Sequence, residues 1–238
     1  MSHSDPRIHF VDTCESTNDI AHTLEMDGSS QCAVVANHQT RGRGRLGRLW
    51  VSEPEQGLYL SWRCLPPVPP SQGGALPLVA AVAIHDLCVS LGLSPTLKWP
   101  NDILIGRNKL AGILCEARIH GEKWHAVVGV GLNIQPPKQG WSEALSATSI
   151  YEELKHAPSR DALASDLLNH LERTLEAFKL NGMPWLISQW ITRGPELGTE
   201  FVHRNQVGTY EGLTEDGSIR LRIDGRVSSI SAGDIELV

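Results

Sequence analysis

Residues 96–132 read TLKWPNDILIGRNKLAGILCEARIHGEKWHAVVGVGL. Short apolar runs alternate here with turn signals, a spacing that is typical of neighbouring strands joined by tight connections. The stretch therefore predicts an antiparallel or mixed sheet. Its expected strands are Thr96–Trp99, Ile103–Ile105, Leu110–Arg118 and Trp124–Leu132, with turns at Gly106–Asn108 and at His120-Gly121.

The segments on either side extend this sheet and cover it with helices. Residues 75–91 are apolar on every side, which predicts a central, buried helix. Apolar residues recur at helical spacing over residues 159–180, and Pro184 begins another short helix. Earlier in the chain we expect strands at Ile8–Val11, Cys32–Asn37 and Leu58–Trp62, and a short helix from Ser16 to about Met26.

After Leu197 the pattern changes to short strands split by Asp-Gly turns, as expected of a small β-barrel. The sequence thus predicts an α+β fold in two domains. Residues 1–194 would form a mixed or antiparallel sheet flanked by helices, and residues 195–238 the barrel.

Composition excludes several classes of protein. The 238 residues are 41% hydrophobic and 20% charged, and the formal net charge of −6 argues against a protein that coats nucleic acid. The longest nearly apolar stretch, Ala75–Ile84, contains Pro77 and is shorter than the roughly 20 residues of a membrane span. The N-terminus lacks a secretion signal and the five cysteines form no Cys-x-x-Cys pair, so we expect a cytoplasmic protein with reduced thiols and no membrane partner.

A basic, glycine-rich segment follows the expected strand at Cys32–Asn37. Residues 41–48 read RGRGRLGR, with four arginines and no acid. Glycines allow the backbone to approach a ligand closely, and guanidinium groups match phosphate or carboxylate, so we expect the loop to order over a highly charged anion. A solvated run of charges is the alternative. The spacing Gly42-x-Gly44-x-x-Gly47 also fits dinucleotide-binding and kinase loops, but no helix follows it directly and the other kinase motifs are missing from the sequence.

Polar side chains interrupt apolar strands at further places. Lys98 and Asp102 flank a Trp-Pro-Asn turn, and they should be paired or face a cleft because an isolated buried charge is costly. A surface salt bridge at a tight turn is the alternative. Lys109 can present a charge to a bound carboxylate or phosphate, and Gly112 allows close approach. The Asn133 amide, at the end of an apolar strand, could bind a base or ribose edge, although a plain strand end is equally common.

Two absent motifs narrow the reaction class. The chain has neither a Gly-x-Ser-x-Gly nor a His-Glu-x-x-His motif, which argues against acyl-enzyme and zinc chemistry. The remaining possibility is electrostatic catalysis, in which lysine and arginine side chains stabilise charge around a phosphate.

Five motifs occur together in a family order: ESTN at residues 15–18, QTRGRGRLGRLW at 39–50, KWPND at 98–102, KLAGIL at 109–114 and GVGLN at 129–133. On these residues the chain resembles a biotin protein ligase over essentially its whole length. The resemblance implies the class II synthetase-like fold of the biotin and lipoate ligases, followed by an SH3-like C-terminal barrel. It also implies a two-step activity: biotin and ATP form biotinyl-5′-AMP with Mg²⁺, and biotin is then transferred to a lysine of the biotin carboxyl carrier protein of acetyl-CoA carboxylase or a related enzyme.

The resemblance assigns ligand-binding roles to individual residues. The biotin head group would be held by Ser16, Thr17, Asn18 and Gln39. The loop residues Gly42, Arg43, Gly44 and Arg45 would close over biotin and the adenylate, and Gly112 would line the same pocket. Arg48, Trp50, Asn133 and Trp141 would form the nucleotide side.

Three residues would take part in catalysis. Lys109 is the principal candidate, at the carboxylate and α-phosphate. Arg45 would help to retain the adenylate, and Asp102 would orient or deprotonate the incoming lysine. No protein metal ligand is assigned.

The resemblance has one departure and leaves alternatives. Because the Ser-Thr-Asn motif begins at Ser16, we expect no N-terminal DNA-binding domain, no repressor activity and no DNA partner, whereas a homodimer is possible. A lipoate or octanoate ligase is the nearest alternative, although those enzymes carry a different arginine-glycine signature. A non-catalytic binder of nucleic acid or of a phosphorylated partner is the other, and its affinity would fall steeply with salt.

Overall fold

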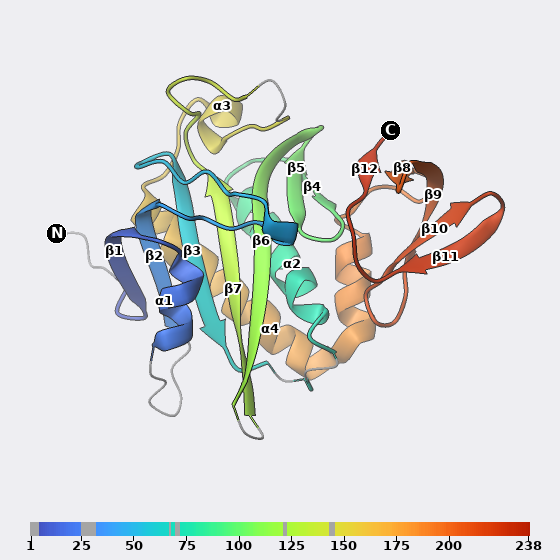
Figure 1. Ribbon diagram of the computed structural model, residues 1–238, viewed down its shortest axis with the longest axis horizontal. Helices are drawn as coiled ribbons and strands as arrows, with labels where there is room; N and C mark the ends of the chain where they lie inside the picture. Colours follow the sequence, from blue (N-terminus) through green and yellow to red (C-terminus); the bar gives the residue numbers. More distant parts are fainter. Residues whose placement is uncertain (1–4, 25–31, 67, 70–71, 121–122, 143–145) are drawn as a thin grey trace.

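The computed structural model describes residues 5–24, 32–66, 68–69, 72–120, 123–142 and 146–238. A seven-stranded sheet in the order β1-β2-β3-β7-β6-β5-β4 forms its centre (Figure 1). β1 and β2 pair in parallel and the remaining neighbours are antiparallel, so the prediction of a mixed sheet is confirmed. The strands are β1 (Ile8–Cys14), β2 (Cys32–Gln39), β3 (Gly57–Cys64), β4 (Pro95–Lys98), β5 (Asp102–Ile105), β6 (Asn108–His120) and β7 (Lys123–Asn133). The expected end of the first helix near Met26 and the turn residue Gly121 lie outside the described residues.

One face of the sheet carries the main hydrophobic core. Alternate residues of a strand share a face, and on β7 the side chains of Val128, Val130 and Leu132 are at most 3% exposed. Helices α2 (Ala75–Ser90) and α4 (Arg160–Ile191) cover this face, behind the sheet in Figure 1. Burial of each large aliphatic side chain stabilises the fold by about 1.5–3 kcal/mol, so this layer fixes the position of the sheet.

The long helix α4 has a break that the sequence predicts. Gly182 has φ 72° and ψ −172°, outside the helical region, and Pro184 follows it. Proline has no backbone N–H and begins helices more readily than it continues them. The expected separation into a helix ending near Leu180 and another beginning at Pro184 is thus confirmed.

The opposite face of the sheet is covered differently. Helix α1 (Thr17–Thr23) lies over β2 and β3, and the segment between β2 and β3, which contains the 3₁₀ turn η1 (Arg45–Gly47), crosses in front of β7 and β6 (Figure 1). The facing residues on β7 are glycines, Gly129 and Gly131, instead of large side chains. The segment between β2 and β3 can therefore lie close to the sheet. Helix α3 (Ile150–Leu154) follows β7.

The C-terminal residues form a second, antiparallel sheet in the order β11-β10-β9-β8-β12. It packs beside the β4–β5 end of the large sheet, where the Trp99 indole donates a hydrogen bond to the Gly217 carbonyl at 3.1 Å. Its strands are β8 (Glu200–His203), β9 (Gln206–Leu213), β10 (Ile219–Ile223), β11 (Arg226–Ile230) and β12 (Glu236–Leu237).

Two further observations concern the expected environment of the protein. No disulfide bond joins any of the five cysteines, Cys14, Cys32, Cys64, Cys88 and Cys115. Among the helices of the described residues, none has the length and apolar character needed to cross a membrane.

Candidate active site

A neutral polar cluster lies under α1, where the sequence places Ser16, Thr17 and Asn18. These three residues are at most 4% exposed, and buried polar groups are costly unless they are hydrogen-bonded. Gln39 Oε1 accepts hydrogen bonds from the Thr17 backbone N–H at 2.8 Å and from the Thr17 hydroxyl at 3.0 Å, and Gln39 Nε2 donates to Ser52 Oγ at 2.9 Å. We call Thr17, Asn18, Gln39, Ser52 and Ser61 the polar cluster.

Asn18 is fixed on both sides of its amide. The Ser61 hydroxyl lies 2.5 Å from Asn18 Oδ1 and 2.6 Å from Thr17 Oγ1, while Asn18 Nδ2 donates to Glu116 Oε2 at 2.7 Å. A Cβ atom on Gly129 would clash with the Asn18 side chain, so glycine is required where the amide lies against β7. The polar cluster is therefore a preformed set of donors and acceptors.

An apolar section follows, formed by Trp50 on two paired glycines. Gly112 of β6 and Gly131 of β7 are register partners, and the indole ring lies against both. A Cβ atom on Gly112 would be 2.8 Å from the ring, and one on Gly131 would overlap it. The Trp50 indole nitrogen is buried and has no hydrogen-bond partner among the described residues. Gly112 thus permits the close approach that the sequence indicates, and the approaching group is the Trp50 ring.

Positive charge gathers beyond this apolar section. Lys109 Nζ lies 2.6 Å from Asp102 Oδ1 and 5.4 Å from the centroid of the Trp50 ring. Lys98 Nζ approaches the same carboxylate at 3.9 Å. The expected pairing of Lys98 with Asp102 is present, but Lys109 is the closer partner. A bulge between β5 and β6 places Lys109 opposite Leu104, whose side chain is on the same face of β5 as that of Asp102. We call Lys98, Lys109, Arg45 and Arg48 the cationic cluster.

Arg45 and Arg48 connect the loop to the C-terminal sheet. The Arg45 guanidinium donates to Asn101 Oδ1 at 3.2 Å and to the Gly233 carbonyl and Asp234 Oδ1, each at 3.3 Å. Arg48 forms an ion pair with the same Asp234 carboxylate. One acid from the far end of the chain thus neutralises two of the four loop arginines.

The first two loop arginines have different partners. The guanidinium of Arg43 forms two 2.8 Å hydrogen bonds with Asp19, which lower the pKa of Asp19 and raise that of Arg43. Arg41 pairs with Glu15 on the surface. Gly42 must be glycine, because its Cβ would clash with the Trp50 carbonyl, whereas a Cβ on Gly44 would be 3.5 Å from its nearest neighbour.

The side-chain N–H groups of Asn133 and Trp141 form hydrogen bonds within the protein. Asn133 Nδ2 donates to the carbonyls of Lys109 and Thr148 at 3.2 and 2.9 Å, so it positions the backbone of Lys109. The Trp141 indole donates to the Glu152 carboxylate at 3.0 and 3.2 Å.

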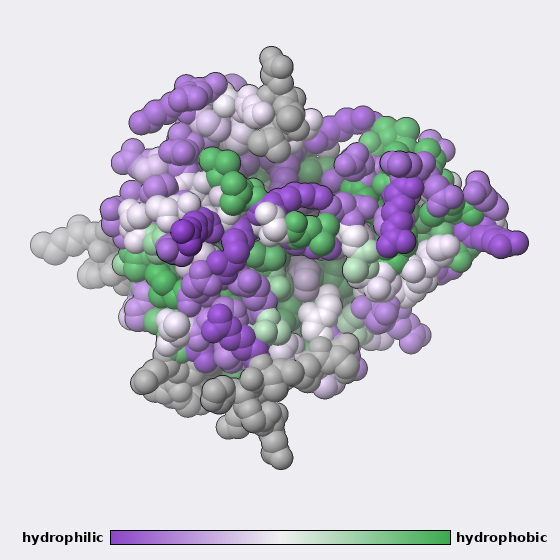
Figure 2. All heavy atoms as spheres, viewed as in Figure 1, coloured by the Kyte–Doolittle hydropathy of each residue, from purple (hydrophilic) through white to green (hydrophobic). Residues whose placement is uncertain are grey.

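The site has a linear order that follows β7. Gly129 lies under Asn18, Gly131 lies under Trp50, and Asn133 holds Lys109. At about 3.3 Å per residue, this stretch spans roughly 13 Å. A ligand that fits it has a neutral polar head, an apolar body and an anionic end. Figure 2 views this face, where hydrophilic side chains surround scattered hydrophobic ones. The loop residues Leu46, Leu49 and Val51 are 67–81% exposed.

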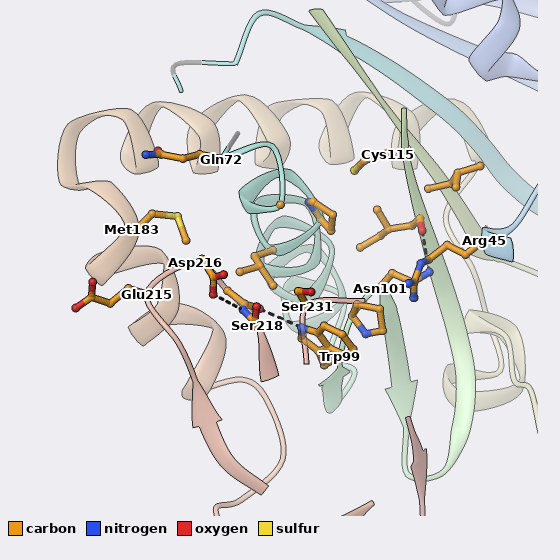
Figure 3. A pocket seen from close by; sticks show the side chains of 17 residues that line it. Arg45, Gln72, Trp99, Asn101, Cys115, Met183, Glu215, Asp216, Ser218 and Ser231 are labelled. Atoms are coloured by element: carbon orange, nitrogen blue, oxygen red, sulfur yellow. Dashed lines mark hydrogen bonds between the residues drawn. The ribbon is translucent and has the colours of Figure 1, made fainter. Parts of the chain in front are cut away.

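A cavity of about 510 Å³ adjoins the cationic end, between the two sheets (Figure 3). Arg45, Trp99 and Asn101 line one side, and the 215–218 turn and Ser231 of the C-terminal sheet line the other. The Trp99-Pro100 peptide bond in its wall is cis. The cavity therefore connects the Arg45 end of the site with the space beside the C-terminal sheet.

Sequence reasoning missed several residues of the site. Asp19, Ser61, Glu116 and Asp234 each hold one of its expected members. Glu116 and Asp234 are separated from their partners by 73 or more residues, so local spacing gives no signal for them. Asp19 is adjacent to the Ser-Thr-Asn motif. The loop sequence has four arginines and no acid of its own, which indicates that acids from elsewhere in the chain lie near it.

Comparisons with known proteins agree with this geometry. The family model described as the biotin/lipoate A/B protein ligase family matches residues 11–133. The biotin–[acetyl-CoA-carboxylase] ligase of Mycobacterium tuberculosis is 34% identical over 90% of this chain and 81% of its own length, and the bifunctional ligase/repressor BirA of Bacillus subtilis is 29% identical over 96% and 73%. Among solved structures, the biotin protein ligase from Aquifex aeolicus in complex with biotin and ATP superposes with a TM-score of 0.81 at 25% identity, covering 98% of this chain and 99% of that one. The chain belongs to the biotin/lipoate A/B protein ligase family.

Proposed function

We propose that this protein is an ATP-dependent biotin protein ligase, which activates biotin as biotinyl-5′-AMP and transfers it to a lysine of a biotin carboxyl carrier domain. The order of groups along β7 is the observation that carries the proposal. The relatives support it, because they include ligases named for biotin and acetyl-CoA carboxylase and a structure holding biotin and ATP.

Biotin has the three parts that the site requires. Its ureido ring is neutral and both donates and accepts hydrogen bonds, as the hydroxyl and amide groups of Thr17, Asn18 and Gln39 do. Its thioether ring and aliphatic chain would take the place on Gly112 and Gly131 that the Trp50 ring occupies in this structure, so the ring would have to move aside when biotin binds. Its carboxylate would then reach Lys109.

The first step joins the biotin carboxylate to ATP. A carboxylate oxygen attacks the α-phosphorus, the bond between the α-phosphorus and its bridging oxygen breaks, and pyrophosphate leaves. Charge develops on the α-phosphate oxygens, and Lys109 beside them would stabilise it, since fixed charges are most effective where charge develops. Arg45 and Arg48 would exchange the Asp234 carboxylate for phosphate oxygens. We propose that Mg²⁺ arrives with the triphosphate as part of the substrate.

The second step transfers the acyl group to the acceptor. The lysine amine attacks the carbonyl carbon of the mixed anhydride, the bond from that carbon to the phosphate oxygen breaks, and AMP leaves. The amine must lose a proton to attack, and we propose that the Asp102 carboxylate, held between Lys98 and Lys109, orients or accepts it. Arg45, closed onto Asn101 and the Gly233 carbonyl, would keep the adenylate from water until the acceptor arrives.

We propose that the acceptor enters from the cavity between the two sheets, because the cavity opens beside Arg45 and Asn101. Residues 195–238 would form a separate SH3-like domain that completes this entrance. We propose a reducing, cytoplasmic setting, because the five cysteines form no disulfide bond.

Biotin-dependent exchange of pyrophosphate into ATP tests the proposal without requiring the correct acceptor. Lipoate and octanoate, assayed in parallel with MgATP, represent the other branch of the family. Exchange with biotin alone is the expected result. Exchange only with lipoate or octanoate would assign the protein to that branch, and no exchange with any of the three acids would contradict adenylation of these acids.

A further inference from the structure

Glu116 lies beneath the polar cluster but belongs to none of the motifs discussed above. It is on β6, and its side chain is about one-third exposed. Its Oε2 atom accepts from Asn18 Nδ2 at 2.7 Å and from the Arg43 guanidinium at 3.3 Å. A single carboxylate oxygen therefore connects the head-group residue Asn18 to the start of the arginine-glycine loop.

The carboxylate determines which way the Asn18 amide faces. An ionised carboxylate only accepts hydrogen bonds, so the Asn18 nitrogen must point toward it. The Asn18 oxygen then points toward Ser61, whose hydroxyl is 2.5 Å away. A carbonyl oxygen has two lone pairs, so after accepting from Ser61 this atom can still accept one N–H from a ligand.

The surroundings keep Glu116 available for Asn18. His22 lies behind it, with Nε2 3.8 Å from Glu116 Oε2. Burial, together with nearby Arg118, lowers the pKa of His22 to about 4, so the ring is neutral near pH 7 and does not compete as a cation. Arg43 is held independently by its two hydrogen bonds to Asp19, so the loop keeps an anchor when Glu116 is changed.

We propose that Glu116 is a positioning residue for head-group recognition, which turns the Asn18 oxygen into a fixed acceptor for a ureido N–H of biotin. The inference rests on the proposed function, because biotin supplies that N–H. Without the Glu116 carboxylate, the Asn18 side-chain amide can rotate and present its nitrogen to the ligand. The site then loses affinity for biotin and its preference for a ligand with an N–H at this position.

The test measures dissociation constants by calorimetry for biotin and for its two mono-N-methyl ureido analogues. The variants are Glu116→Ala and Glu116→Gln, with Glu172→Ala as the control. Glu172 is a half-buried glutamate on α4, away from the site, and it pairs with Arg7. A hydrogen bond to a charged group is worth about 1.5–3 kcal/mol, which corresponds to roughly tenfold or more in affinity.

Four results are expected. Wild type prefers biotin over at least one methyl analogue. Glu116→Ala binds biotin at least tenfold more weakly and loses most of that preference. Glu116→Gln, whose side-chain carbonyl can still accept from Asn18, should have a biotin affinity and a preference between those of wild type and Glu116→Ala. If the alanine variant does not fold, the result for Glu116→Gln tests the proposal. Glu172→Ala binds biotin within twofold of wild type.

Two results would overturn the inference while the proposed function stands. Either both Glu116 variants bind biotin as wild type does, or they lose biotin and the methyl analogues in equal proportion, as a merely structural residue would. Failure of the wild type to bind biotin would instead overturn the proposed function.

Discussion

The two ends of the site are built in different ways. In the polar cluster, Thr17 and Asn18 are 3% and 4% exposed, and their partners Gln39, Ser61 and Glu116 lie on strands of the large sheet. In the cationic cluster, the Lys109 and Arg48 side chains are 32% and 66% exposed, and the arginines are held by Asp234 from the C-terminal sheet.

This difference indicates how the two ends respond to a ligand. The polar cluster has its hydrogen bonds made within the core, so a neutral head group meets donors and acceptors that are already in place, which lowers the cost of binding. The cationic cluster has carboxylate partners that a phosphate can replace, so this end must rearrange. We therefore expect the polar cluster to set the affinity for biotin and the cationic cluster to set the rate of adenylation.

The largest effect should follow removal of Lys109. We expect Lys109→Ala to reduce biotin-dependent ATP–pyrophosphate exchange by about 100-fold or more, because it removes a charge placed where the transition state becomes anionic. The melting temperature should change little, since the side chain is one-third exposed. Lys179→Ala, on α4, is the control. Unchanged exchange, or loss of the folded state, would remove the assigned role.

Asn18→Ala should have the next largest effect, at the other end. The truncation leaves the Glu116 carboxylate and the Ser61 hydroxyl without their shared partner, so KM for biotin should rise about tenfold or more while kcat changes by a few-fold at most. Steady-state kinetics at saturating ATP measures the split, with Asn169→Ala as the control. A fall in kcat at unchanged KM would contradict the assignment of biotin affinity to the polar cluster.

Arg45→Gly should loosen the connection between the loop and the C-terminal sheet. Because Arg45 bridges Asn101 to the Gly233 carbonyl and the Asp234 carboxylate, its loss should release the adenylate early. We expect several-fold more biotin on lysines of bystander proteins, detected by streptavidin blotting. Arg41→Gly changes an exposed arginine of the same loop, paired with Glu15, and should label the carrier domain alone. Strict labelling by both variants would show that Arg45 does not retain the adenylate.

The smallest effect concerns the stability of the polar end at low pH. The pKa of His22 is lowered by burial to about 4, below its ordinary value of 6.5, so the unfolded chain takes up a proton before the folded chain does. The free energy of unfolding should therefore fall by about 1–2 kcal/mol as the pH falls from 6.5 to 4. His22→Leu should show a shallower pH dependence in urea titrations, whereas exposed His156→Leu should retain that of wild type. Parallel profiles for wild type and His22→Leu would contradict this assignment.

Much of the fold could be predicted because its signals are local. The apolar helix over residues 75–91, the alternating strands of residues 96–132 and the break before Pro184 all correspond to elements of the structure. The parallel pairing of β1 with β2 has no local signal, since strand direction depends on the connection through α1. Helix α3, with five residues, is too short for periodicity to reveal. The SH3-like character of the C-terminal sheet stays a prediction.

The candidate site was predictable where motifs are contiguous. The motifs suggested a single site on one face of the large sheet, and the structure brings these residues together there: Thr17, Asn18, Gln39, Trp50, Gly112 and Lys109. The acids that hold them were not predictable, because Glu116 and Asp234 reach their partners only through the tertiary fold. The loop arginines looked free to bind an anion, yet each pairs with a carboxylate of the chain.

The most direct test of the account is a crystal structure of this protein with a non-hydrolysable analogue of biotinyl-5′-AMP. We expect the ureido ring within hydrogen-bond distance of Thr17, Asn18 and Gln39, the chain over Gly131 with the Trp50 ring moved aside, and the phosphate mimic beside Lys109. A ligand bound in the reverse direction, or seated in the cavity between the two sheets, would contradict the division of the site into a polar and a cationic end.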